Sequence, residues 1–388
     1  MLACGMRMLT LLSLLAGVYV WWRAVWPLSC RWWNKLLLAA VIMGLALFFY
    51  IVRMLGGPLP FAPDLPGWFQ LAFAWCYLVF MAFFLGLVAA HVVRGCVWLL
   101  VPAWRRWSRP TRRSVGNCAH LVLLVGVVLM VSVGMRNAFL PPEVREVRLS
   151  LPVSRELKVA LLTDLHVDAL KQREFMQDVV NRVNALEPDL VLIAGDCVDG
   201  TVEQRGSFLE PLRGLKSPVY AVLGNHEYYS GYEPWAQFLP TLGLTLLQNE
   251  HRYLEEFGLV LAGVTDPAAR VYGLEPPDVE KALAGAPADK PVLLLAHQPQ
   301  LALPAEDAGV ALQLSGHTHG GLMPGLAEIT ARYNCGFVRG LYRLPSGMLL
   351  YTSPGTSLWS GLPLRLADPA EITLIKVEST KDEHARRL

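Results

Sequence analysis

Two histidines separated by one residue stand in a glycine-rich stretch, Ser-Gly-His-Thr-His-Gly-Gly, at residues 315–321. They follow an apolar run at 310–314 that predicts a short strand. Residues i and i+2 of a strand point to the same face, so His317 and His319 can reach one object. Imidazole is a common ligand of Zn, Mn and Fe. The stretch therefore indicates a metal site, although such pairs also occur on polar strands that bind no metal.

The chain before this stretch alternates between strand and helix patterns. Residues 172–186 have apolar side chains at helical spacing, and Pro188 follows them. Short apolar runs predict strands at 157–163, 189–194, 218–223, 259–264, 292–296, 348–352 and 372–377. Strands interleaved with helices indicate an α/β layered domain. In open sheets of this class, ligands bind at the carboxyl ends of the strands.

Five of the predicted strands end in residues that could bind a metal or transfer a proton. These residues are Asp164 and His166, Asp196 and Asp199, Asn225 and His226, His297, and finally His317 and His319. Carboxylates, imidazoles and an amide suit divalent ions such as Mn, Fe or Zn. Two such ions, about 3.5–4 Å apart, can clamp the attacking and leaving oxygens of a phosphoryl displacement. We expect these side chains to converge at one edge of the sheet.

The ordered blocks Asp-x-His, Gly-Asp-x-x-Asp, Gly-Asn-His-Glu, His and Gly-His-x-His, within residues 157–319, resemble the calcineurin-like metallophosphoesterase superfamily. Their surroundings resemble its bacterial membrane-associated branch. The resemblance implies a four-layer α/β/β/α sandwich that hydrolyses a phosphate mono- or diester or a pyrophosphate bond by attack of metal-bound hydroxide. Some relatives have Arg directly after the second Asp of Gly-Asp-x-x-Asp. Here Gly200 follows Asp199, which makes a protein serine/threonine phosphatase less expected.

The same resemblance assigns roles to the nine residues. It implies a first divalent metal ion held by Asp164, His166, Asp196 and His319, and a second held by Asp196, Asn225, His297 and His317. Asp196 would bridge the two ions because a carboxylate offers two oxygens. His226 would contact the phosphate and help to protonate the leaving group, and Asp199 would orient its ring. No other cofactor is expected.

The first third of the chain has a different composition. The protein is 54% hydrophobic with a mean hydropathy of +0.38, and apolar stretches at 8–22, 36–52, 68–93 and 118–135 predict about four transmembrane helices. The first stretch could instead be a cleaved signal peptide, but no small-x-small cleavage site follows it, so we expect a retained helix. Residues 1–136 carry 12 Lys or Arg and one acid, Asp64, whereas residues 137–388 carry 22 and 31. The negative second part argues against nucleic acid as a partner.

The basic residues also predict an orientation. Arg and Lys gather between the first and second stretches and between the third and fourth, which places both loops in the cytoplasm. The protein would then be a multi-pass inner-membrane protein with an extracytoplasmic catalytic domain. The basic segment 105–113 could bind anionic lipid headgroups, but topology alone explains it. His91 and His120 lie near span ends beside arginines, so we expect them to be interfacial.

These observations divide the chain into a transmembrane region at 1–136, a linker at 137–150, a phosphoesterase domain at 151–380 and a charged tail at 381–388. We expect a phosphorylated substrate. An anchored enzyme favours a lipid or lipid-linked substrate over a soluble nucleotide or sugar phosphate. The alternative is a non-catalytic membrane sensor or scaffold, against which the intact pair Asp199 and His226 argues. Tyr228, Tyr229, Tyr232 and Trp235 either shape a substrate pocket or pack a helix.

Overall fold

The computed structural model describes residues 2–57, 63–101, 108–359, 361 and 363–380. The chain forms two compact units, Met1–Arg136 and Asn137–Leu388. Part of the basic segment 105–113 and the whole tail 381–388 lie outside the described residues, so their predictions stay open.

The described part of the first unit is helical, as predicted. Its helices are α1 (Leu2–Val20), which continues as a π-helical turn η1 (Trp21–Val25), α2 (Trp32–Ala46), α3 (Phe48–Gly56), α4 (Gly67–Leu100) and α6 (Arg109–Ala138). Among the described residues, three helical segments are long and apolar enough to cross a membrane: Arg7–Val25, Gly67–Leu100 and Ser114–Ala138. Helices α2 and α3 together make a fourth such segment if they are counted as one span.

The second predicted span differs from a straight helix. Helices α2 and α3 meet at an angle of 64°, and the break lies at Leu47. Directly after it, the buried ring of Phe48 stacks on Tyr77 of α4, with ring centroids 4.5 Å apart. Apolar composition predicts that a helix is buried but not its direction, which depends on contacts with distant residues such as this one.

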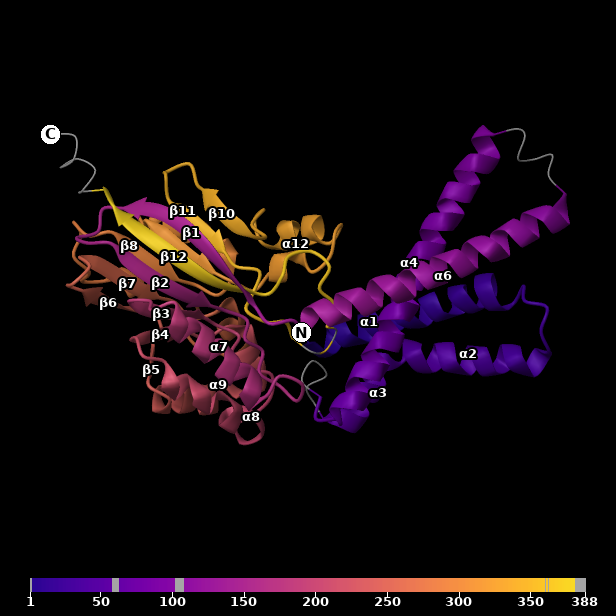
Figure 1. The fold of residues 1–388 in the computed structure, drawn as a ribbon, viewed down its shortest axis with the longest axis horizontal. Helices are drawn as coiled ribbons and strands as arrows, with labels where there is room; N and C mark the ends of the chain where they lie inside the picture. The colour runs from indigo at the N-terminus through magenta and orange to yellow at the C-terminus, as the bar shows by residue number, and fades with distance from the viewer. Residues whose placement is uncertain (1, 58–62, 102–107, 360, 362, 381–388) are drawn as a thin grey trace. The chain divides into compact units, whose positions relative to one another are not determined.

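The second unit contains two six-stranded sheets (Figure 1). The first sheet has the spatial order β1 (Glu143–Leu151), β12 (Glu371–Ser379), β2 (Leu157–Leu162), β3 (Leu190–Ala194), β4 (Val219–Val222) and β5 (Leu244–Leu246). The second has the order β10 (Gly340–Arg343), β11 (Leu349–Thr352), β9 (Leu312–Ser315), β8 (Val292–Leu295), β7 (Leu259–Gly263) and β6 (Glu250–Leu254).

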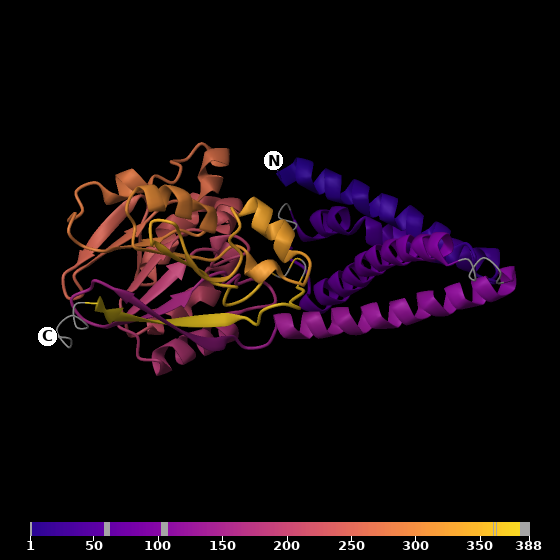
Figure 2. The ribbon, with the colours of Figure 1, turned by 90° about the horizontal axis from the view of Figure 1, so that it is seen from above.

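The helices of this unit are α7 (Arg173–Ala185), α8 (Val202–Leu209), α9 (Asn225–Thr241), α10 (Val279–Leu283), α11 (Ala302–Asp307) and α12 (Ala327–Tyr333), with 3-10 turns η2 (Glu210–Gly214), η3 (Pro267–Tyr272), η4 (Pro299–Leu301) and η5 (His319–Gly321). Helices α7, α8 and α9 pack on the outer face of the first sheet, and α10 and α11 pack on that of the second. Figure 1 shows α7, α8 and α9 together beside β3, β4 and β5, and Figure 2 shows the same unit from above.

Strand alternation builds the layers of the core. On β2, Val159 and Leu161 point into a cluster shared by both sheets, whereas Ala160 and Leu162 point to a cluster formed with α7, α8 and α9. A third cluster joins the outer face of the second sheet to α10 and α11. Because successive strand residues face opposite ways, fully apolar strands bury both faces. The second unit is thus the predicted α/β/β/α sandwich.

Strand β1 begins within the segment expected as a linker, 137–150. Residues Glu143–Leu151 pair in parallel with Glu371–Ser379 of β12 along the full length of the strand. The first half of β1 is mostly exposed, and only its last residues alternate between buried and exposed. The many charges of this segment, including Arg145 and Glu146, indicated a linker. An edge strand accepts such charges because one side of it faces water.

Candidate metal centre

The strand ends that carry the predicted residues lie at one rim of the sandwich. Strands β2, β3 and β4 are parallel neighbours in the first sheet, and β8 and β9 are parallel neighbours in the second. Asp164, Asp196, His297 and His317 each follow the last residue of their strand by two positions. The parallel arrangement therefore brings these residues to the same edge.

Left-handed backbone turns direct these side chains inward. Of the nine non-glycine residues with positive φ in the described part of the chain, five belong to the site: Asp164 (53°), His166 (45°), Asp196 (53°), His317 (73°) and His319 (48°). A non-glycine residue in this region costs about 1–3 kcal/mol, so the surrounding structure must hold it there. Such concentrated strain is a feature of functional sites.

Two glycines give the turns the space that they need. A Cβ atom on Gly316 would lie 2.0 Å from Oγ1 of Thr163 and 2.2 Å from Oδ2 of Asp164. A Cβ atom on Gly224 would lie 2.2 Å from Oδ1 of Asp196. Any larger residue at these positions must displace a carboxylate of the site.

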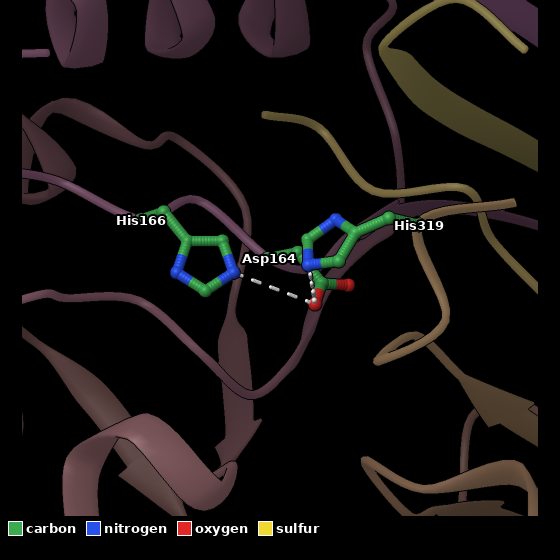
Figure 3. A group of neighbouring side chains, drawn as sticks. All are labelled: Asp164, His166 and His319. Atoms are coloured by element: carbon green, nitrogen blue, oxygen red, sulfur yellow. Dashed lines mark ion pairs between the residues drawn. The ribbon is translucent and has the colours of Figure 1, made fainter. Parts of the chain in front are cut away.

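The first ligand group consists of Asp164, His166 and His319 (Figure 3). Both imidazoles face the Asp164 carboxylate, with Nε2 of His166 at 3.7 Å and Nε2 of His319 at 3.6 Å from Oδ1. The Thr163 hydroxyl donates to Oδ2 of Asp164 at 2.8 Å. Burial raises the pKa of Asp164, but His319 and His166 outweigh it and hold that pKa below its usual value. Asp164 is therefore a carboxylate in this site.

The second ligand group consists of Asp196, His297 and His317. Nε2 of His297 lies 3.2 Å from Oδ2 of Asp196. The same oxygen lies 3.8 Å from Nε2 of His166. Asp196 thus stands between the two groups, within reach of ligands from both.

Hydrogen bonds fix which ring nitrogens face the site. Nδ1 of His297 donates to the carbonyl of Ala194 at 2.8 Å, and Nδ1 of His166 donates to Asp199 at 3.0 Å. These bonds leave Nε2 of both rings facing the carboxylates, the orientation usual for metal-bound histidine. Nε2 of His166, Nε2 of His297 and Oδ1 of Asn225 are buried and have no hydrogen-bond partner. Buried polar atoms need a partner, so this donor set fits divalent cations.

The charges of the site also suit cations. Burial by itself lowers the pKa of His166, but the carboxylates of Asp199 and Asp164 outweigh it and raise that pKa to about 10. Burial lowers the pKa of His317 to about 4 and that of His319 to about 3, which keeps both imidazoles neutral at pH 7. Metal ligation requires neutral imidazoles, so His317 and His319 are ready to bind, whereas His166 would have to give up a proton to a bound cation.

Asp199 joins the proposed acid to the ligand groups. Its Oδ1 accepts a hydrogen bond from Nδ1 of His226, and its Oδ2 accepts the one from His166. The sequence prediction connected Asp199 with His226, and the structure adds the contact with His166. The His226 side chain is 14% exposed, whereas that of His166 is fully buried. His226 can therefore meet a ligand from solvent, although its ring nitrogen also lies within 4.8 Å of ligand atoms of His166 and Asp196.

Asn225 completes the set, so the structure brings all nine predicted residues to this rim. It is the first residue of α9 and is only 5% exposed. Its side chain forms a hydrogen bond with Tyr229. The backbone N–H of the next residue, His226, donates to Oδ1 of Asp196 at 2.9 Å.

Glu227 has a role that the motif alone did not reveal. Its buried carboxylate accepts hydrogen bonds from the backbone N–H groups of Asp196 (3.1 Å), Cys197 (2.6 Å) and Gly224 (2.7 Å). It therefore ties the end of β3 to the end of β4. Burial and the nearby Asp196 carboxylate raise the pKa of Glu227 to about 7. Its presence in the Gly-Asn-His-Glu block was the only sequence signal.

Arg365 is a second residue that sequence reasoning missed. Its guanidinium is buried and donates to the carbonyls of Pro354, Ser357, Asp368 and Pro369. Burial lowers its pKa to about 10, so it remains charged at pH 7, and it interacts electrostatically with Asp164. Because its hydrogen-bond partners are backbone carbonyls, no residue spacing marks it.

The aromatic residues after the third block separate into two kinds. Tyr228 and Trp235 belong to the core cluster beneath α9, and Tyr232 packs against it. Tyr229 lies beside His226, with ring centroids 5.4 Å apart. Of the four aromatic residues, Tyr229 is the one placed to meet a substrate at His226.

Comparison with known proteins agrees with this geometry. Residues 157–321 match the family model of calcineurin-like phosphoesterases. The chain is 40% identical over 271 residues to an uncharacterized metallophosphoesterase of Helicobacter pylori, covering 69% of this chain and 72% of that protein. It is 34% identical over an alignment of 399 residues to a transmembrane protein with metallophosphoesterase domain of Danio rerio, covering 94% and 86%. A Bos taurus protein of the same name is 32% identical, with coverage of 95% and 87%. The chain therefore belongs to the calcineurin-like metallophosphoesterases.

Proposed function

We propose that this protein is a hydrolase that uses two divalent cations to cleave a phosphate ester or anhydride bond. The observation that carries the proposal is the position of Asp196 between two groups of possible ligands, in which the buried Nε2 atoms of His166 and His297 make no hydrogen bond. The donors are oxygen and nitrogen atoms without a thiolate, a set that suits Mn, Fe or Zn.

Each ion has its own ligands in this proposal. Asp164, His166, Asp196 and His319 hold the first cation. Asn225, His297 and His317 hold the second, together with the shared Asp196. Bound as a pair, such cations make hydroxide available near neutral pH and stabilise the charge on the phosphoryl group.

His226 protonates the leaving group, and Asp199 positions its ring. The Asp199 carboxylate accepts a hydrogen bond from Nδ1, which turns Nε2 away from Asp199 and leaves it 3.9 Å from Oδ2 of Asp196. Burial lowers the pKa of His226, but the carboxylates of Asp196 and Asp199 outweigh it and raise that pKa above the usual value. A histidine with a raised pKa retains its proton near neutral pH and can donate it.

Activity with a generic substrate tests this assignment. Purified full-length protein with Mn²⁺ should hydrolyse an aryl phosphate mono- or diester. His226→Ala should still bind two metal ions but lose most turnover, typically by 10²–10⁴-fold for a general acid. Asp196→Ala should be the more severe change and lose bound metal. Metal content is measured by inductively coupled plasma mass spectrometry. Wild-type turnover in His226→Ala, or two ions retained in Asp196→Ala, would refute the respective role.

Membrane attachment and substrate class belong to the same proposal. The apolar helices of the first unit and the relatives named as transmembrane proteins support insertion in a membrane. The positive-inside rule supports an extracytoplasmic second unit. An anchored phosphoesterase meets lipids at high local concentration, so we propose a lipid or lipid-linked phosphate or pyrophosphate as the substrate. Hydrolysis rates on a panel of lipid phosphates, lipid pyrophosphates and nucleotide diesters test this substrate class. A preference for soluble nucleotides would contradict it.

A further inference from the structure

A basic cluster lies between α1, α4 and α6 in the first unit. Nε of Arg23 donates to Nε2 of His91 at 3.3 Å, and the hydroxyl of Tyr19 lies 3.0 Å from Nδ1 of the same ring. The rings of His91 and His120 are 5.7 Å apart. Arg94 lines a cavity together with both histidines. Two guanidinium groups and two imidazoles thus gather at one place.

The charge of this cluster has no compensating carboxylate nearby in the first unit. Asp64 is the only acid in residues 1–136, and it lies just before the first residue of α4. Arg94 lies far along the same 34-residue helix. At about 1.5 Å per residue, the two are on the order of 40 Å apart. Charged side chains in a membrane-spanning segment are costly unless a group of opposite charge accompanies them.

The cluster adjoins apolar cavities. Arg94, His91, Gly116 and His120 are among the residues that line a cavity of about 270 Å³ between α4 and α6. A second cavity of about 460 Å³ extends between α1, α2, α4 and α6, and its lining includes Val20, Ile42, Phe83 and Leu124. His120 borders both cavities. The ligand that fits is an anion attached to an apolar chain.

The length of α4 places the cluster at a suitable depth. A helix of 34 residues is roughly 50 Å long, whereas the hydrocarbon core of a bilayer is about 30 Å thick. The last third of α4, which holds His91 and Arg94, therefore extends to the level of the lipid headgroups when the helix spans a membrane. A basic pocket between helices at this depth is suited to a phosphate headgroup.

We propose that Arg23, Arg94 and His120 bind the phosphate of an anionic glycerophospholipid, with an acyl chain in the larger cavity, and that His91 positions the Arg23 side chain. Guanidinium groups bind phosphate oxygens with paired hydrogen bonds, which favours a phosphate over a diffuse negative charge. The occupant is a lipid rather than a free anion, because the cavity next to the charges is apolar. This site is separate from the metal centre of the second unit.

Binding to full-length protein in detergent tests the proposal without reference to phosphoesterase activity. Native mass spectrometry compares phosphatidylglycerol with phosphatidylcholine of the same acyl chains. We expect phosphatidylglycerol to bind at least about tenfold more tightly, which corresponds to about 1.4 kcal/mol. Equal binding of the two lipids would overturn the proposal. Displacement of the lipid by an equimolar amount of glycerol 3-phosphate would show a free-anion site and would overturn it as well.

Matched variants separate this site from general charge effects. Arg23→Gln/Arg94→Gln should reduce phosphatidylglycerol binding to the phosphatidylcholine level, whereas Arg23→Lys/Arg94→Lys, which keeps the charge but loses the paired hydrogen bonds, should keep only part of the preference. The control Arg53→Gln/Arg136→Gln removes the same amount of charge elsewhere in the unit. This variant should keep the full preference for phosphatidylglycerol. An equal loss of the preference in this control would contradict a local site.

The variant Gly116→Leu fills the smaller cavity and leaves every charge in place. It should also weaken phosphatidylglycerol binding, and unchanged binding would contradict a role of the cavity. Thermal unfolding of each variant confirms that it is folded.

Discussion

At the scale of single residues, the centre depends on how Asp199 divides its two oxygens. One oxygen accepts a hydrogen bond from the ring of His166, a proposed metal ligand, and the other accepts one from the ring of His226, the proposed acid. Both contacts involve Nδ1, so one buried carboxylate sets the tautomer of two imidazoles with different tasks. A change at Asp199 should therefore affect metal binding and proton transfer together.

We expect Asp199→Asn to weaken binding of the first metal by about 10–100-fold and also to lower turnover at saturating metal. An amide has a single acceptor oxygen, so it cannot accept a hydrogen bond from both rings. Calorimetric titration with Mn²⁺ and measurement of kcat test the two effects.

Asp189→Asn is the matched control. Asp189 lies at the other end of β3 and also accepts a hydrogen bond, in its case from the backbone N–H of Lys158. It should change neither quantity. Loss of turnover in Asp199→Asn with wild-type metal affinity would mean that Asp199 serves His226 alone.

At the scale of elements, short turns after parallel strands build the candidate metal centre. The left-handed residues Asp164 and Asp196 are held by backbone contacts such as the N–H of His317, which donates to the Asp164 carboxylate at 3.1 Å. Gly316 allows that contact because a Cβ atom there would meet Thr163 and Asp164. The backbone of β9 thus orients a ligand that belongs to β2, in the other sheet.

We expect Gly316→Ala to lower the free energy of unfolding by about 1–3 kcal/mol, because the added methyl group must displace the side chains that it overlaps. It should also weaken metal binding through Asp164. Chemical denaturation of the full-length protein with and without a chelator measures both effects.

Gly214→Ala is the control, since its Cβ atom would make an ordinary 3.5 Å contact with Val180. Similar stability losses in the two variants would show that the space at Gly316 is not required.

The elements differ in how well the sequence predicted them, for physical reasons. Strands β2, β3, β7 and β8 are continuous apolar runs buried on both faces, so composition alone identified them. The edge strands β1, β6 and β10 are partly exposed and charged, and these were not anticipated. The nine site residues share motif spacing. Glu227 and Arg365 act through backbone atoms, which leave no such pattern.

At the scale of the whole molecule, two units of opposite charge share one chain. Residues 1–136 carry 12 Lys or Arg and one acid, whereas residues 137–388 carry 22 and 31. Basic segments near apolar helices stay on the cytoplasmic side, while acidic residues contribute little to orientation. The proposed topology therefore rests on the arginines of the first unit.

We expect alkaline phosphatase fused after Leu388 to be active, because that enzyme requires an oxidising, extracytoplasmic environment. A green fluorescent protein that folds only in the cytoplasm should be dark at the same position. Fusions after Val101, in the segment between α4 and α6, should show the reverse pattern. A bright fluorescent fusion after Leu388 would overturn the topology.

The pairing of β1 with β12 also determines when the second unit can finish folding. Within the described strands, β12 is the sole neighbour of β1 and separates it from β2. The chain enters the sandwich through β1, yet the strand that receives β1 is built from Glu371–Ser379. Pairing between segments so distant in sequence forms slowly. During synthesis, β1 and the side of β2 that pairs with β12 therefore stay unpaired until residues Glu371–Ser379 leave the ribosome. A chain that stops short of Glu371 leaves both of these strands without that partner.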